Sequence, residues 1–90
     1  MNDNRAWYPI KVEEVVSRAQ AQIGEDAMRL VRSLTGNGEE AEGLLALAWV
    51  IVQERTLVPR ELVQDIRELS DGFIDPADFP LNLDEFIEQE

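Results

Sequence analysis

The chain contains no cysteine and no histidine. Thiolates and imidazoles are therefore missing as nucleophiles, as proton carriers near neutral pH and as ligands for zinc or haem, and no disulfide can form. Lysine occurs only once, at Lys11. We therefore expect no cofactor, and no catalysis by a nucleophile activated by a neighbouring base.

The residues left for chemistry lack a supporting pattern as well. None of the three serines stands in a G-x-S-x-G or S-x-x-K arrangement, and Gly38 is followed by glutamates where a phosphate-binding loop needs a lysine. Asp71, Asp75 and Asp78 offer oxygen ligands, but their spacing does not match an EF-hand loop. The sequence therefore predicts a protein that is not an enzyme and that has no metal site.

Long apolar runs and a basic surplus are also lacking. The longest apolar run, Leu44–Val52, has nine residues, whereas a membrane helix needs about 20. No apolar signal core follows the first residues. The net charge of −11 opposes the phosphate attraction on which nucleic-acid binding depends. We expect a cytoplasmic protein that binds neither a membrane nor nucleic acid directly.

The charge that is present is distributed unevenly. Residues 1–38 carry five basic and five acidic side chains, whereas residues 39–90 carry three basic and fourteen acidic ones and hold the whole net charge. No basic residue follows Arg67. An uncompensated acidic region repels itself, so it either keeps the protein soluble or binds a basic partner.

Ninety residues, of which 44% are hydrophobic, fit a single domain that spans residues 1–90. Apolar residues recur at helical spacing from Val12 to Leu34. This periodicity predicts either one long helix or two short ones broken at Gly24. Residues 1–10 precede the periodic stretch, and we expect them to form an N-terminal arm.

Two more helices are predicted further along the chain. The glycines of residues 35–38 end the first helical region, and residues 44–52 are apolar on every side, which indicates a central helix with Trp49 as a core anchor. Glu39, Glu40 and Glu42 would lie in its first turn, where the helix dipole favours negative charge. Pro59 suits the first position of the next helix, whose core face we expect to be formed by Leu62, Val63, Ile66 and Leu69.

The last twenty residues, 71–90, mix seven large apolar side chains with acids. Asn82 followed by Glu85 resembles a capping box that opens a short last helix, Leu83 to Gln89. Either this closing segment wraps back over the core, or it is an arm that binds another molecule; we favour wrapping, since large apolar groups are rarely left in water. The predicted fold class is all-α, a small bundle of three to five helices with an acidic, partly irregular C-terminal segment packed back on it.

Some of the acids lack a local structural explanation. In the first helical region Glu14 with Arg18, and Glu25 with Arg29, are favourable pairs four residues apart, whereas no base on residues 59–70 is spaced to offset the acidic stripe of that helix. An ordinary solvated face is the alternative interpretation of this stripe. The candidate partner-binding residues are the stripe and four acids of the closing segment, namely Glu61, Asp65, Glu68, Asp78, Asp84, Glu85 and Glu88.

These observations favour a non-catalytic acidic module that binds a partner protein with a basic surface. Its natural form would be an inhibitor, immunity or antitoxin-type protein of bacterial or phage origin, which covers a nuclease or another nucleic-acid-binding protein. The alternative is a structural or accessory subunit that self-associates, or joins a larger complex, through the apolar face of residues 12–34 or through Trp7 and Tyr8.

Overall fold

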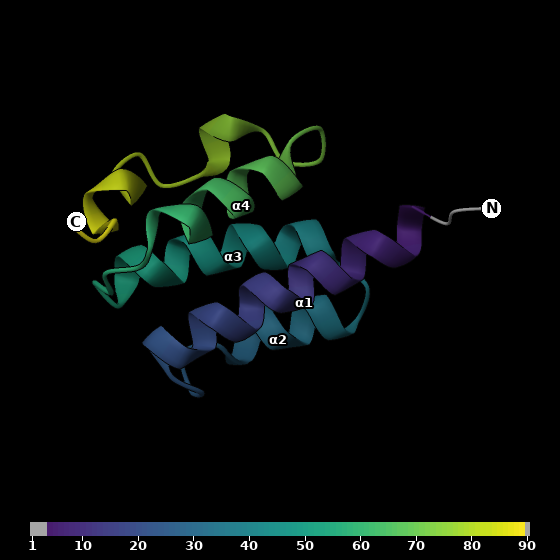
Figure 1. The fold of residues 1–90 in the computed structure, drawn as a ribbon, viewed down its shortest axis with the longest axis horizontal. Helices are drawn as coiled ribbons and strands as arrows, with labels where there is room; N and C mark the ends of the chain where they lie inside the picture. Colours follow the sequence, from purple (N-terminus) through teal and green to yellow (C-terminus); the bar gives the residue numbers. More distant parts are fainter. Residues whose placement is uncertain (1–3, 90) are drawn as a thin grey trace.

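The computed structural model describes residues 4–89, and their side chains from residue 7 onward. Within this range the chain forms four α-helices, α1 (Asn4–Ile23), α2 (Arg29–Gly36), α3 (Glu40–Gln53) and α4 (Arg60–Ser70), followed by two short 3-10 helices, η1 (Pro76–Asp78) and η2 (Leu83–Phe86). Successive α-helices run in opposite directions (Figure 1). The predicted all-α bundle is confirmed.

The first helical region divides into two helices at Gly24. This residue has a φ of +106°, a left-handed conformation that a glycine adopts without steric cost. Residues 25–28 form a turn that leads into α2, and Met28 is fully buried there. The chain therefore adopts the second of the two predicted alternatives.

The first turns of α1 occupy most of the expected N-terminal arm. Residues 4–10 are helical and continuous with the rest of α1, with Pro9 inside the helix, and residues 1–3 lie outside the described range. Because helical structure extends upstream of Val12, Trp7 and Tyr8 are held on a regular element rather than on a loose arm.

Helix α3 is the centre of the bundle, as predicted, and contacts α1, α2, α4 and η2. Leu44, Leu47 and Ile51 are fully buried on it. The prediction for Trp49 was wrong, since its side chain is 43% exposed. Its indole Nε1 donates to the backbone oxygen of Asp78 at 3.0 Å, so Trp49 lies at the edge of the core and uses both its apolar ring and its polar N–H.

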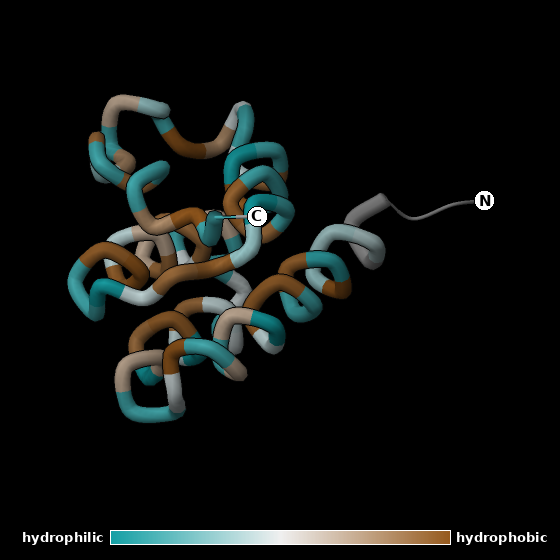
Figure 2. Tube along the Cα trace, turned by 60° about the vertical axis from the view of Figure 1, so that its left-hand side comes forward, coloured by the Kyte–Doolittle hydropathy of each residue, from teal (hydrophilic) through white to brown (hydrophobic). Residues whose placement is uncertain are grey.

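Helix α4 buries the predicted core face, because Leu62, Val63, Ile66 and Leu69 all belong to the core. Pro59 precedes the first helical residue and has an extended backbone, one position earlier than predicted. Figure 2 shows hydrophobic stretches alternating with hydrophilic ones along the helices, as packing of one helix face against the core requires.

The closing segment wraps back over the bundle, and the arm alternative is wrong for the described residues. Four of its side chains lie in the core, namely Ile74, Phe79, Leu83 and Ile87. Two backbone hydrogen bonds tie its end to Val58, in the connection before α4: Val58 N–H donates to the oxygen of Phe86, and Glu88 N–H donates to the oxygen of Val58, each at 2.8 Å. Phe73 and Leu81 point outward, and Leu81 is 100% exposed.

The capping box predicted for the closing segment does not form. Asn82 makes no side-chain cap hydrogen bond, and the short helix is a 3-10 turn that ends at Phe86 rather than an α-helix reaching Gln89. Because Ile87 is instead pulled into an extended bridge with Val58, the helix cannot continue.

Candidate protein-binding site

One end of the bundle collects residues from three distant parts of the sequence. Because the helices alternate in direction, the start of α1, the connection from α2 to α3 and the end of α4 lie at the same end (Figure 1). Trp7 and Tyr8 come from α1, Glu40 from the start of α3, and Phe73 from the turn after α4. We call this the site end of the molecule.

An aromatic cluster of Trp7, Tyr8 and Phe73 occupies the site end. The Tyr8 and Phe73 rings lie 5.4 Å apart between centroids with an interplanar angle of 43°, an arrangement in the favourable range for aromatic pairs. The Tyr8 hydroxyl donates to the backbone oxygen of Leu69 at 2.6 Å. Tyr8 is thereby fixed to the end of α4, while Trp7 is 56% and Phe73 68% exposed.

The first acidic flank consists of Glu39, Glu40 and Glu42, at the start of α3. Together with the aromatic cluster these residues line a cavity of about 1020 Å³. Burial raises the pKa of Tyr8 above its ordinary value, and the negative charges of Glu40 and Glu42 raise it further. The field of this flank therefore reaches the aromatic cluster.

The second acidic flank consists of Asp65 and Glu68, on the second half of α4, and Asp71, which follows the helix. These acids and the aromatic cluster line another cavity, of about 380 Å³, together with Lys11. The aromatic cluster thus lies between two groups of carboxylates. Two of the residues predicted for partner binding, Asp65 and Glu68, belong to this arrangement.

The prediction that no base offsets the stripe on α4 holds along that helix but is wrong in three dimensions. Arg18 of α1 donates to the Asp65 carboxylate at 2.6 Å, so it does not form the pair with Glu14 that its spacing suggested. Because Asp65 is paired, the surplus charge of the stripe lies on its two ends, Glu61 and Glu68, which are both exposed.

The two ion pairs predicted within the first helical region are both replaced. Lys11 instead of Arg18 contacts Glu14, at 3.3 Å. Arg29 pairs with Asp26 rather than with Glu25, at 3.1 Å.

The four predicted acids of the closing segment, Asp78, Asp84, Glu85 and Glu88, are exposed but lie elsewhere. Asp84 accepts from Arg67 at 2.8 Å. At 3.6 residues per turn, Arg60 and Arg67 share one side of α4, about 120° from the stripe. A small cavity lined by both arginines and Asp84 marks that side. Three cavities formed by described residues are lined by Asp65 or Glu68, and none of the four acids lines any of the three.

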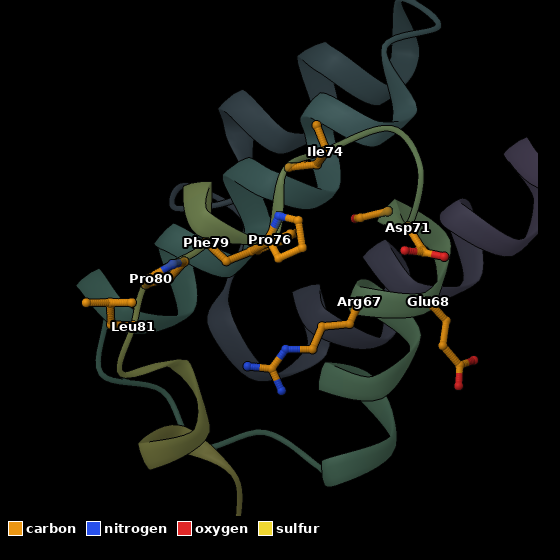
Figure 3. Close-up of a pocket in the computed structure, with 9 residues that line it drawn as sticks. Arg67, Glu68, Asp71, Ile74, Pro76, Phe79, Pro80 and Leu81 are labelled. Carbon is orange, nitrogen blue, oxygen red and sulfur yellow. The ribbon is translucent and has the colours of Figure 1, made fainter.

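A further cavity, of about 610 Å³, lies between the end of α4 and the start of the closing segment. Figure 3 shows Arg67 and Glu68 extending from α4 in opposite directions, with Pro76, Phe79 and Pro80 on the facing segment. Ser70 also lines it, and its hydroxyl is buried without a hydrogen-bond partner among the described residues. This cavity adjoins the second acidic flank through Glu68 and Asp71.

Sequence reasoning missed Phe73 and the first acidic flank as site residues. The glutamates had a sufficient local explanation as acids at a helix start, and no pattern along the chain links residues 7, 40 and 73. Only the alternation of helix directions brings them together. Trp7 and Tyr8 were singled out, as a contact surface of the alternative function.

No group of three or more acidic residues within residues 4–89 is arranged to hold a metal ion. Within the same residues, no helix is both long enough and apolar enough to cross a membrane. Comparisons with protein-family models, with curated proteins and with solved structures found no match to this chain.

Proposed function

We propose that this chain is a non-catalytic module that binds a partner protein with a basic surface through its site end. The observation that carries the proposal is the pair of half-exposed aromatic side chains, Trp7 and Phe73, between two groups of carboxylates. Protein interfaces are typically built in this way, with large aromatic anchors at the centre and polar residues around them.

The acidic flanks supply the second element of the proposal. Charges around an interface raise the association rate and select partners of the opposite sign. An inhibitor, immunity or antitoxin-type role fits this arrangement, because such proteins cover a basic surface on a nuclease or another nucleic-acid-binding protein. In this role the chain would act in the cytoplasm without binding nucleic acid itself.

The test begins with capture of proteins from the host's lysate on the immobilised chain at low salt, followed by release with raised salt. A released protein is then purified, and its affinity is measured for Trp7→Ala and for the matched control Leu57→Ala. Leu57 is 54% exposed, close to the value for Trp7, but it follows α3, whose 14 residues span roughly 20 Å away from the site end.

We expect Trp7→Ala to weaken binding at least tenfold, as loss of a central aromatic anchor of about 2 kcal/mol would. Leu57→Ala should leave the affinity unchanged. Equal effects of the two substitutions, or no effect of Trp7→Ala, would reject the proposal. Retention of the circular dichroism spectrum and thermal midpoint shows that each variant is folded.

The charge test uses two double reversals that change the net charge equally. Glu39→Lys with Glu68→Lys alters both flanks, whereas Glu85→Lys with Glu88→Lys alters the closing segment. Asp65 is spared because a lysine there would face Arg18. We expect the first pair to weaken binding and to reduce its salt dependence. A larger loss with the second pair would move the binding surface to the closing segment.

The alternative function, a self-associating or accessory subunit, keeps one supporting observation. Leu30 of the apolar stretch 12–34 and the neighbouring Ile10 are each 60% exposed, although Val12, Val16 and Val31 of that stretch are buried in the core. Light scattering at several protein concentrations and two salt levels distinguishes the two functions, because an oligomer that ignores salt favours self-association.

A further inference from the structure

We propose that the cavity between the aromatic cluster and the first acidic flank receives the guanidinium group of an arginine from the partner. We call it the arginine cavity; its walls include Trp7, Tyr8 and Phe73 together with Glu39, Glu40 and Glu42. This inference rests on the proposed function and names the chemical group that the site end recognises.

The arginine cavity offers room for a side chain beside its aromatic rings. Its volume of about 1020 Å³ lies at the upper end of the roughly 300–1,000 Å³ typical of ligand pockets. Trp7 keeps 56% of its surface exposed, whereas Tyr8 is anchored by its bond to Leu69 and Phe73 packs on Tyr8. An entering side chain therefore meets aromatic surface held by a fixed support.

The charges around the arginine cavity determine whether it favours a cation or an anion. The start of α3 contributes about half of a positive charge through the helix dipole, but three carboxylates stand on the same turn and outweigh it. None of the described residues that line the cavity is basic. Glu40 and Glu42 also raise the pKa of Tyr8, so their negative field acts at its phenol group. A phosphate or carboxylate ligand is therefore disfavoured, and a cation is favoured.

Arginine fits the combination of groups better than lysine does. Its planar guanidinium stacks on an aromatic face and forms paired hydrogen bonds with a carboxylate, whereas the ammonium of lysine is a compact, strongly hydrated point charge. On the other flank the molecule already contains a single guanidinium–carboxylate contact, where Arg18 donates to Asp65 at 2.6 Å.

The probe is Nα-acetyl-arginine methylamide, added to the ¹⁵N-labelled full chain and followed by NMR. The chain has two tryptophans, so the indole N–H signal of Trp7 reports the aromatic cluster, the amides of residues 38–42 report the arginine cavity in particular, and the Trp49 indole serves as an internal control. We expect saturable shifts of the Trp7 indole and of the backbone amides of residues 38–42. The Trp49 indole should not move.

Three comparisons make the result specific. Nα-acetyl-citrulline methylamide has nearly the same shape without the charge and should cause no shift at equal concentration, and the lysine analogue should bind more weakly than the arginine probe. The variant Glu40→Gln with Glu42→Gln should weaken arginine binding severalfold, whereas Glu85→Gln with Glu88→Gln should not. Equal shifts with citrulline, or equal movement of both indoles, would overturn the assignment.

The outcomes also separate this inference from the proposed function. If the arginine probe leaves Trp7 unmoved while a captured partner still depends on Trp7, the arginine assignment fails and the function stands. If the probe binds as expected but Trp7→Ala binds the partner normally, the function fails while the cavity keeps its preference for arginine.

Discussion

Replacement of Gly43 by alanine tests how closely α2 and α3 approach each other beside the first acidic flank. Gly43 is buried on α3, directly after Glu42. A Cβ atom added there would lie 2.5 Å from Cγ2 of Thr35 on α2, and 3.5 Å from the Thr35 nitrogen and the Val31 oxygen. Only the first of these three distances is too short for ordinary van der Waals contact.

Two effects of opposite sign act on the free energy of unfolding. Alanine is better than glycine in the interior of a helix by about 1 kcal/mol, whereas forcing an extra methyl group into a packed contact costs roughly 1–3 kcal/mol. The net expectation for Gly43→Ala is a destabilisation of about 0–2 kcal/mol. In the Thr35→Ser background the clashing methyl is absent, so the same change should stabilise the protein by about 1 kcal/mol.

Urea unfolding followed by circular dichroism measures all four members of this cycle. We expect a coupling free energy of about 1–3 kcal/mol between positions 35 and 43, well above the roughly 0.5 kcal/mol seen for independent sites. If Gly43→Ala stabilises the protein equally in both backgrounds, the two helices do not approach as closely as described, and the position of the first acidic flank must be revised.

Three further predictions concern the site and its supports. Tyr8 is the only tyrosine, so ultraviolet titration of the phenol isolates its pKa; Glu40→Gln should lower this pKa toward the ordinary 10.0, and Glu61→Gln should not change it. The hydrogen bond from Arg32 holds the pKa of Glu13 below 4.5, so this pair stabilises the fold above pH 4.5 and loses its effect as the pH falls through the lowered pKa. Glu13→Gln should therefore flatten the decline of the thermal midpoint below pH 4.5, and an unchanged decline would contradict this. Leu83→Ala should lower the free energy of unfolding by about 2–5 kcal/mol because the side chain is fully buried, whereas Leu81→Ala should change it by no more than about 0.5 kcal/mol. Equal losses would mean that the closing segment is packed differently.

The helices could be predicted from the sequence because their signals are local. The spacing of Leu62, Val63, Ile66 and Leu69 placed one face of α4 in the core, and the structure confirms it. Gly24 left two alternatives open, because the sequence alone does not give its φ. The pairing of Arg18 was not predictable, since its partner Asp65 lies 47 residues away and becomes a neighbour only when α1 packs on α4.

The errors on α3 and in the closing segment share a physical cause, which is tertiary contact overriding a local pattern. Trp49 belongs to a run that is apolar all round, yet its indole N–H donates to the backbone oxygen of Asp78 at the edge of the core and the residue stays 43% exposed. Asn82 has the spacing of a capping box, but the bridge between Val58 and Ile87 draws the chain into an extended path.

Half of the candidate site could be predicted from the sequence and half could not. The stripe on α4 was visible as an i, i+4, i+7 pattern, and two of its acids line cavities at the site end. The first acidic flank was explained by the helix dipole alone, because nothing in the order of residues shows that Glu40 faces Tyr8. The aromatic cluster combines positions 7, 8 and 73, which only the alternating helix directions bring together.

Photo-cross-linking to the captured partner shows which end of the bundle the partner covers. Benzoylphenylalanine is placed at position 73 in one variant and at position 57 in another, because Phe73 and Leu57 are both more than half exposed but lie toward opposite ends of the bundle. We expect a covalent adduct with the partner from position 73 and none from position 57. An adduct from position 57 alone would contradict it, because the partner would then cover the end of the molecule that lacks the aromatic cluster and its acidic flanks.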